Sequence, residues 1–110
     1  MTSLDDRRRA LEETYILDFE RSLKVRARRN RLLAEWVAAE IGRNDVDAYV
    51  NEVMTIAIAS PEDTGLIQKI RADFSAAGRV ADEALIREKM HELMYTAAEA
   101  LESEQARQGY

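Results

Sequence analysis

The residue types that most often carry catalysis are scarce in this chain. Its 110 residues include one histidine, His91, and no cysteine, so a thiolate nucleophile, a thiolate metal site and a disulfide are all excluded. The run from His91 to Tyr95 opens like the HExxH zinc motif, but Tyr95 stands where the second histidine ligand is required. We therefore predict no metal site and no cofactor, and we interpret His91 as an exposed or half-buried helix residue.

The acidic residues and the glycines give no better basis for catalysis. Glu12 and Glu13 are adjacent, so on a helix they point to different faces and make poor acid–base partners. The chain has no glycine-rich phosphate loop and no local signature of a serine nucleophile. The sequence therefore predicts a protein that is not an enzyme and that acts by binding a protein partner.

Charge is distributed unevenly along the chain, whose formal net charge is −5. Residues 1–20 carry six acidic and three basic residues, whereas residues 21–31 carry six basic residues and no acidic one. We call this second segment the basic collar: it contains Arg21, Lys24, Arg26, Arg28, Arg29 and Arg31. The remainder of the chain is acidic, which suits pairing of the collar with acids of the same protein or of a protein partner.

The basic collar also suggests an alternative function. Basic residues can bind nucleic acid phosphates, so a small regulator or adaptor could bind nucleic acid, or another complex, through residues 21–31. These basic residues project around most of a helix, however, and the acidic body beside them would repel nucleic acid. We therefore expect no nucleic acid partner.

Helix-forming residues dominate the chain, and the single proline and four glycines leave long uninterrupted segments. The first predicted helix spans about Leu4 to Ile41 and ends at Gly42, which suits a left-handed C-terminal cap. The second begins at Asn44 or Asp45, both good N-cap residues. Leu32, Leu33, Trp36, Val37 and Ile41 recur at helical spacing in the first helix.

Two further helices follow. The third is predicted to start with Ser60 as cap and Pro61 in the first helical position, and to end at Gly78. The fourth begins near Asp82 and is expected to fray from about Glu102, where apolar residues become rare. No strand pattern is present, so the predicted fold class is all-α, a bundle of four or five helices. Four large residues are expected in its core: Trp36, Tyr49, Phe74 and Met94.

The length of the first helix bears on function. A continuous helix from Leu4 to Ile41 would be roughly 55 Å long at 1.5 Å per residue, whereas a compact domain of this size has a radius of gyration of about 13 Å. The helix must therefore fold back, or its first half must project or be mobile. Tyr15 and Phe19, one turn apart in that half, are then either core residues of a folded-back helix or anchors for a partner.

Several motifs of the sequence resemble the zeta subunit of the alphaproteobacterial ATP synthase, a family of inhibitors of the F1 motor. The most specific is the run Ala27-Arg28-Arg29-Asn30-Arg31-Leu32-Leu33-Ala34-Glu35-Trp36. The others are Asp5-Asp6-Arg7, then Glu12, Tyr15, Asp18, Glu20 and Lys24, and the later stretch Ile86-Arg87-Glu88-Lys89-Met90-His91-Glu92-Leu93. The resemblance covers nearly the whole chain.

This resemblance implies a four-helix bundle with a mobile, intrinsically disordered N-terminal segment. In the family that segment inserts between the catalytic alpha and beta subunits near the gamma shaft, becomes helical and stops rotation in the hydrolysis direction. Carried onto this chain, the inhibitory segment is about Thr2 to Phe19, within an N-terminal unit 1–20 that precedes a bundle 21–110.

The resemblance also implies site residues and a location. The expected partner-binding residues are Leu4, Asp5, Asp6, Arg7, Arg8, Arg9, Leu11, Glu12, Tyr15, Ile16 and Phe19. The expected anchoring residues of the basic collar are Lys24, Arg28, Arg29 and Arg31. The chain has no apolar signal segment and no apolar run of about 20 residues, so we expect a cytoplasmic protein, monomeric when free and peripheral to the inner membrane when bound to ATP synthase.

Overall fold

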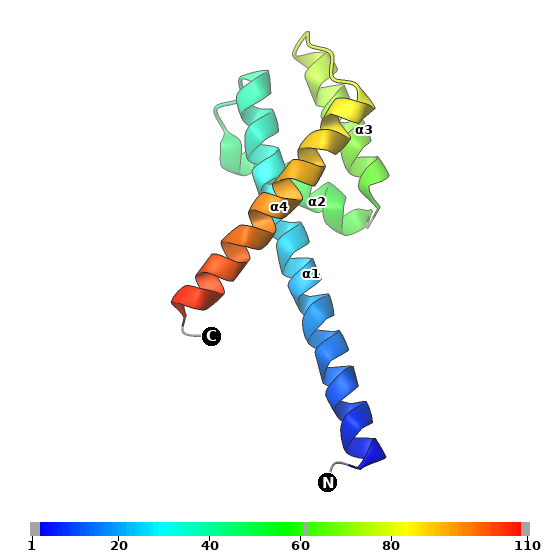
Figure 1. Ribbon diagram of the computed structural model, residues 1–110. Coiled ribbons are helices and arrows are strands. Elements are labelled where there is room, and N and C mark those ends of the chain that lie inside the picture. The colour runs from blue at the N-terminus through cyan, green and yellow to red at the C-terminus, as the bar shows by residue number, and fades with distance from the viewer. Residues whose placement is uncertain (1–2, 61, 109–110) are drawn as a thin grey trace.

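The structure is a computed structural model that describes residues 3–60 and 62–108, except for the side chain of Tyr15. These residues form four helices: α1 (Leu4–Ile41), α2 (Val46–Ala59), α3 (Asp63–Ala76) and α4 (Glu83–Arg107). No strand occurs within the described ranges, and the predicted all-α bundle is confirmed. In Figure 1, α4 crosses α1 near its middle. The helices α2 and α3 lie beside the second half of α1, and the first half of α1 extends away alone.

Both ends of α1 are closed by local hydrogen bonds. At the start, the Asp6 N–H donates to Ser3 Oγ at 3.1 Å and the Ser3 N–H donates to the Asp6 carboxylate at 3.4 Å, which forms a capping box. At the end, Gly42 adopts φ +74° and its N–H donates to the carbonyls of Ala38 and Ala39. The predicted left-handed cap is confirmed, because glycine reaches this conformation without the steric penalty of a Cβ.

The predicted start of the third helix is wrong. Ser60 ends α2, because its N–H donates to the Ile56 carbonyl at 2.9 Å, and α3 begins only at Asp63, with Glu62 in the N-cap position. The Ser60 hydroxyl donates to the Glu62 carbonyl across the turn rather than capping α3. Pro61 lies outside the described residues.

The end of α3 and the start of α4 follow the predicted pattern. Gly78 adopts φ +74° and the Arg79 N–H returns to the Phe74 carbonyl at 2.9 Å, two features of a Schellman-type helix end. The Leu85 N–H donates to the Asp82 carboxylate at 2.7 Å, so Asp82 caps α4 as predicted.

The tail of α4 is more regular than the sequence indicated. We expected fraying from Glu102, but the helix continues to Arg107. Leu101 is buried, and two ion pairs hold the tail against α1, Glu102 with Arg21 and Glu104 with Arg28. These contacts replace the apolar residues whose absence suggested fraying.

The core lies between the second half of α1 and the other three helices. Leu33, Val37, Tyr49, Val53, Ile70 and Ile86 are fully buried in it. Of the predicted core residues, Tyr49 and Phe74 are buried, and Trp36 is half-buried with its ring centroid 5.9 Å from that of Phe74. Met94 is half-buried at the edge of the bundle.

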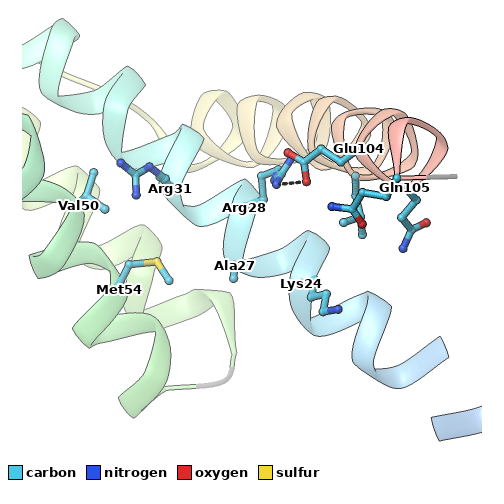
Figure 2. A pocket seen from close by; sticks show the side chains of 10 residues that line it. Lys24, Ala27, Arg28, Arg31, Val50, Met54, Glu104 and Gln105 are labelled. Carbon is cyan, nitrogen blue, oxygen red and sulfur yellow. Dashed lines mark hydrogen bonds and ion pairs between the residues drawn. The ribbon is translucent and has the colours of Figure 1, made fainter. Parts of the chain in front are cut away.

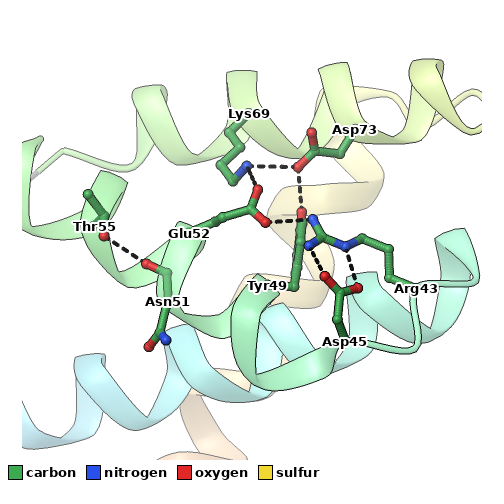
Figure 3. A network of polar contacts seen from close by, with 8 residues as sticks. All are labelled: Arg43, Asp45, Tyr49, Asn51, Glu52, Thr55, Lys69 and Asp73. Carbon is green, nitrogen blue, oxygen red and sulfur yellow. Dashed lines mark hydrogen bonds and ion pairs between the residues drawn. The ribbon is translucent and has the colours of Figure 1, made fainter.

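A charged network surrounds the hydroxyl end of Tyr49 (Figure 3). The hydroxyl donates to Asp73 at 2.7 Å, and Lys69 joins Asp73 to Glu52 with two contacts of 3.1 Å. Arg43 contacts Glu52 at 2.7 Å and lies over the Tyr49 ring at 4.8 Å from its centroid. Burial, and then the hydrogen bond to Asp73, raise the pKa of Tyr49 well above its usual range. The tyrosine thus remains neutral and keeps its proton for Asp73.

Tyr49→Phe tests this network. The substitution keeps the buried ring but leaves Asp73 without one of its two partners, so we expect the free energy of unfolding to fall by about 1.5 kcal/mol. Urea denaturation measures the change. Tyr95→Phe is the matched control, because the Tyr95 side chain is exposed, and it should leave the stability unchanged. Equal stability of both variants would contradict a stabilising role for the hydrogen bond.

Candidate partner-binding surface

The side chains in the first half of α1 are not covered by the bundle. Every residue from 3 to 24 whose side chain the structure describes is exposed, and the first half-buried one is Val25. We call residues 3–24 the arm. Because of the arm, the molecule measures 66 × 29 × 23 Å and its radius of gyration is 17.7 Å, well above the value of about 13 Å for a compact domain. The predicted projecting segment is confirmed, and its mobility in the free protein stays a prediction.

Large apolar side chains lie along one face of the arm. Leu4, Leu11 and Phe19 are exposed, and at 3.6 residues per turn they fall within about 80° of one another. The same face continues into the bundle, since Val37 follows Phe19 by about five full turns. There Leu33 and Val37 are fully buried. The arm therefore extends the core face of α1. Figure 1 shows that this part of the helix lies beyond the other three helices.

The arm contains all the predicted partner-binding residues. Leu4, Asp5, Asp6, Arg7, Arg8, Arg9, Leu11, Glu12, Ile16 and Phe19 are exposed on it. Tyr15 belongs to the helix, but its side chain lies outside the described residues. Sequence reasoning missed Leu23, which is exposed and lies one turn beyond Phe19 on the adjoining part of this face; its spacing of four residues from Phe19 was the available signal.

The basic collar is largely paired within the protein. Arg21 contacts Glu102 at 2.9 Å, and Arg28 forms a two-contact pair with Glu104 at 2.7 and 2.8 Å. The hydrogen bond and charge of Glu104 raise the pKa of Arg28, and Arg28 lowers that of Glu104. Of the two interpretations that the sequence left open, these contacts favour pairing of the collar with acids of the bundle.

The most buried member of the collar is Arg29. Its residue surface is only 3% exposed, and its guanidinium contacts both Asp63 at 2.9 Å and the Asn30 side-chain oxygen at 2.7 Å. Arg26 also contacts Asp63 at 2.9 Å. Burial alone would raise the pKa of Asp63, but hydrogen bonds and charges from Arg29 and Arg26 outweigh it and lower the pKa. Arg29 thus joins α1 to the start of α3 rather than facing a partner.

Comparison with known protein families gives one match over most of the chain. The family model for ATPase inhibitor subunit zeta matches residues 1–100, which include the arm, the collar and most of α4. The chain belongs to this family. Searches among proteins of curated function and among solved structures found no significant match. A zeta-family protein is a regulator of an ATPase and not an enzyme, and its family implies binding to the F1 part of ATP synthase.

The histidine of this zeta-family protein, which the sequence singled out beside a partial zinc motif, lies on the surface of the bundle. His91 is exposed on α4, and its ring meets the edge of Tyr95 at a centroid distance of 5.2 Å. Residues 3–60 and 62–108 contain no group of three His, Cys, Asp or Glu residues placed to hold a metal ion. No helix within these ranges is long and apolar enough to span a membrane.

Proposed function

We propose that this zeta-family protein inhibits ATP hydrolysis by placing its arm between the catalytic alpha and beta subunits of F1, beside gamma, where it blocks rotation. The observation that carries the proposal is the uncovered continuation of the core face of α1 along the arm. A helix face with large apolar residues and no covering element in its own domain is typical of a helix that docks in a groove of a partner.

The arm is also suited to enter such a groove as a helix. Its capping box satisfies the first backbone donors, and Asp5 and Asp6 lie in the first turn, where the helix dipole favours negative charge. Burial of Leu4, Leu11 and Phe19 would each contribute about 1.5–3 kcal/mol before ordering is counted. Three such residues are sufficient for tight binding if the partner is preorganised.

The direct test is hydrolysis of ATP by alphaproteobacterial F1 depleted of its own inhibitor. We expect the full chain to reduce the rate in a saturable way, and a chain that lacks residues 2–19 to have no effect at the same concentrations. Circular dichroism of the truncated chain should show an intact bundle, because the removed residues lack covering contacts. Equal inhibition by the truncated chain would exclude the arm as the inhibitory segment.

A further inference from the structure

Two ion pairs join the tail of α4, residues 101–107, to α1 beside an open space. Beyond their crossing point the two helices diverge (Figure 1), and a hollow of about 540 Å³ lies between α1, α2 and this tail. Arg28 and Glu104 line the hollow and contact each other at 2.7 and 2.8 Å, as Figure 2 shows. Arg21 meets Glu102 at 2.9 Å. Long charged side chains therefore connect the two helices where the hollow interrupts their packing.

A third ion pair holds α1 from another direction. Arg26 contacts Asp63, at the start of α3, at 2.9 Å. At 3.6 residues per turn, Arg21 and Arg28 lie within about 20° of each other around α1, and Arg26 lies about 140–160° away from them. We call these three ion pairs, which α1 makes with α3 and with the tail of α4, the brace. Because they act on nearly opposite sides of α1, bending the helix toward one side lengthens the pairs on the other.

The brace lies where α1 changes from a supported helix to an unsupported one. Within the described ranges, Arg21 is the first residue of α1 with an ion pair to another helix, and Val25 is the first half-buried one. A helix is costly to begin but easy to extend. The turns that the brace holds can therefore be extended into the rest of the arm without a new nucleation step, and Phe19 is only two residues beyond Arg21.

We propose that Glu102 and Glu104 are positioning residues for inhibition. Through the brace they fix the turns of α1 from which the rest of the arm extends, and so they preorganise the apolar face of the arm for its partner. Preorganisation strengthens binding because less conformational freedom is lost when the complex forms. The inference rests on the proposed function. The family match ends at residue 100, so both acids lie outside the part of the chain that it covers.

The first test examines the free chain, without F1. In the tail variant, Glu102→Gln with Glu104→Gln, the backbone amides of residues 18–28 should exchange hydrogen about five-fold faster, the size of effect that two partly exposed ion pairs support. Amides of the bundle core should keep their protection. Glu88→Gln with Glu99→Gln is the matched control, since these are exposed acids of α4 without an ion pair in the described ranges, and it should leave exchange of the same amides unchanged.

The second test exchanges the charges of one pair. Arg28→Glu alone brings two carboxylates together and should accelerate exchange of residues 18–28. Adding Glu104→Arg to the same chain restores an ion pair of opposite polarity and should return the exchange rates to those of the unmodified chain. A substitution that only damages the helix would not be rescued in this way, so failure of the rescue would overturn the assignment of the effect to the pair.

Inhibition of inhibitor-depleted F1 is the third measurement, and it separates this inference from the proposed function. We expect the tail variant to inhibit with about five-fold lower affinity and the control variant to inhibit like the unmodified chain. Unchanged exchange in the tail variant would overturn the brace, whether or not the chain inhibits F1. Faster exchange with unchanged inhibition would overturn the positioning role alone. Failure of the unmodified chain to inhibit would overturn the proposed function and this role with it.

Discussion

Replacing Leu11 and Phe19 by glutamine is expected to abolish inhibition of F1 at concentrations where the unmodified chain saturates, and to leave the bundle as stable as before. Both side chains are exposed, Phe19 to 57%, so their loss removes no contact from the bundle. Glutamine is a good helix former, so the arm retains its helical tendency. Loss of two buried apolar anchors at the partner would remove about 3–4 kcal/mol, which is a weakening of more than a hundred-fold.

Leu17→Gln is the control for this prediction. Leu17 is as exposed as Phe19, at 64%, but it lies two residues earlier and therefore about 160° around the helix. We expect Leu11→Gln and Phe19→Gln, made separately, each to weaken inhibition of F1, because both residues lie on the face shared with the core. Leu17→Gln should leave inhibition unchanged. A loss of the same size for Leu17→Gln would mean that the arm binds through general hydrophobicity and not through one face.

The helices could be predicted from the sequence because their ends depend on local chemistry. Gly42 and Gly78 adopt the left-handed conformation that few other residues reach, and Asp82 caps α4 with its own carboxylate. Ser60 misled the prediction because a serine can end one helix as well as begin the next. Its N–H closes α2, and sequence spacing does not reveal which of the two neighbouring helices uses that group.

The arm could be predicted and the collar could not, for physical reasons. Length alone predicted that a helix from Leu4 to Ile41 must fold back, project or be mobile in its first half, since it is much longer than a compact domain of 110 residues is wide, and the structure shows that it projects. The collar depends on contacts between residues far apart in the sequence. Arg28 meets Glu104 and Arg29 meets Asp63, and several other carboxylates would have served equally well in a sequence-based argument. Tertiary structure alone distinguishes the buried Arg29 from the exposed Lys24.

Asp63→Asn is expected to lower the free energy of unfolding by about 2 kcal/mol at neutral pH, the largest stability effect that we predict for a single polar substitution. The Arg29 guanidinium is almost fully buried and has Asp63 as its anionic partner. Removal of one member of a buried ion pair leaves the other charge uncompensated, which destabilises proteins by about 3–5 kcal/mol. The side chain of Asp63 is 32% exposed, so water compensates part of the charge that the substitution leaves unpaired and places the effect below that range.

The dependence of this difference on pH has a defined sign. The pKa of Asp63 is lowered in the folded protein, so the stability that its carboxylate contributes is fully present above the ordinary aspartate value of about 3.9. It is lost as pH falls through the lower folded-state pKa, because protonation then removes the charge that Arg29 and Arg26 require. Urea denaturation at several pH values should therefore show the free energies of unfolding of the unmodified chain and of Asp63→Asn converging at acid pH.

Asp47→Asn is the control, since Asp47 is 96% exposed at its side chain and lies 4.0 Å from Arg31, and it should change stability by less than about 0.5 kcal/mol. If Asp63→Asn were as mild as Asp47→Asn at neutral pH, then water rather than Asp63 would be compensating the charge of Arg29, and the contact between α1 and α3 would rest on apolar packing alone.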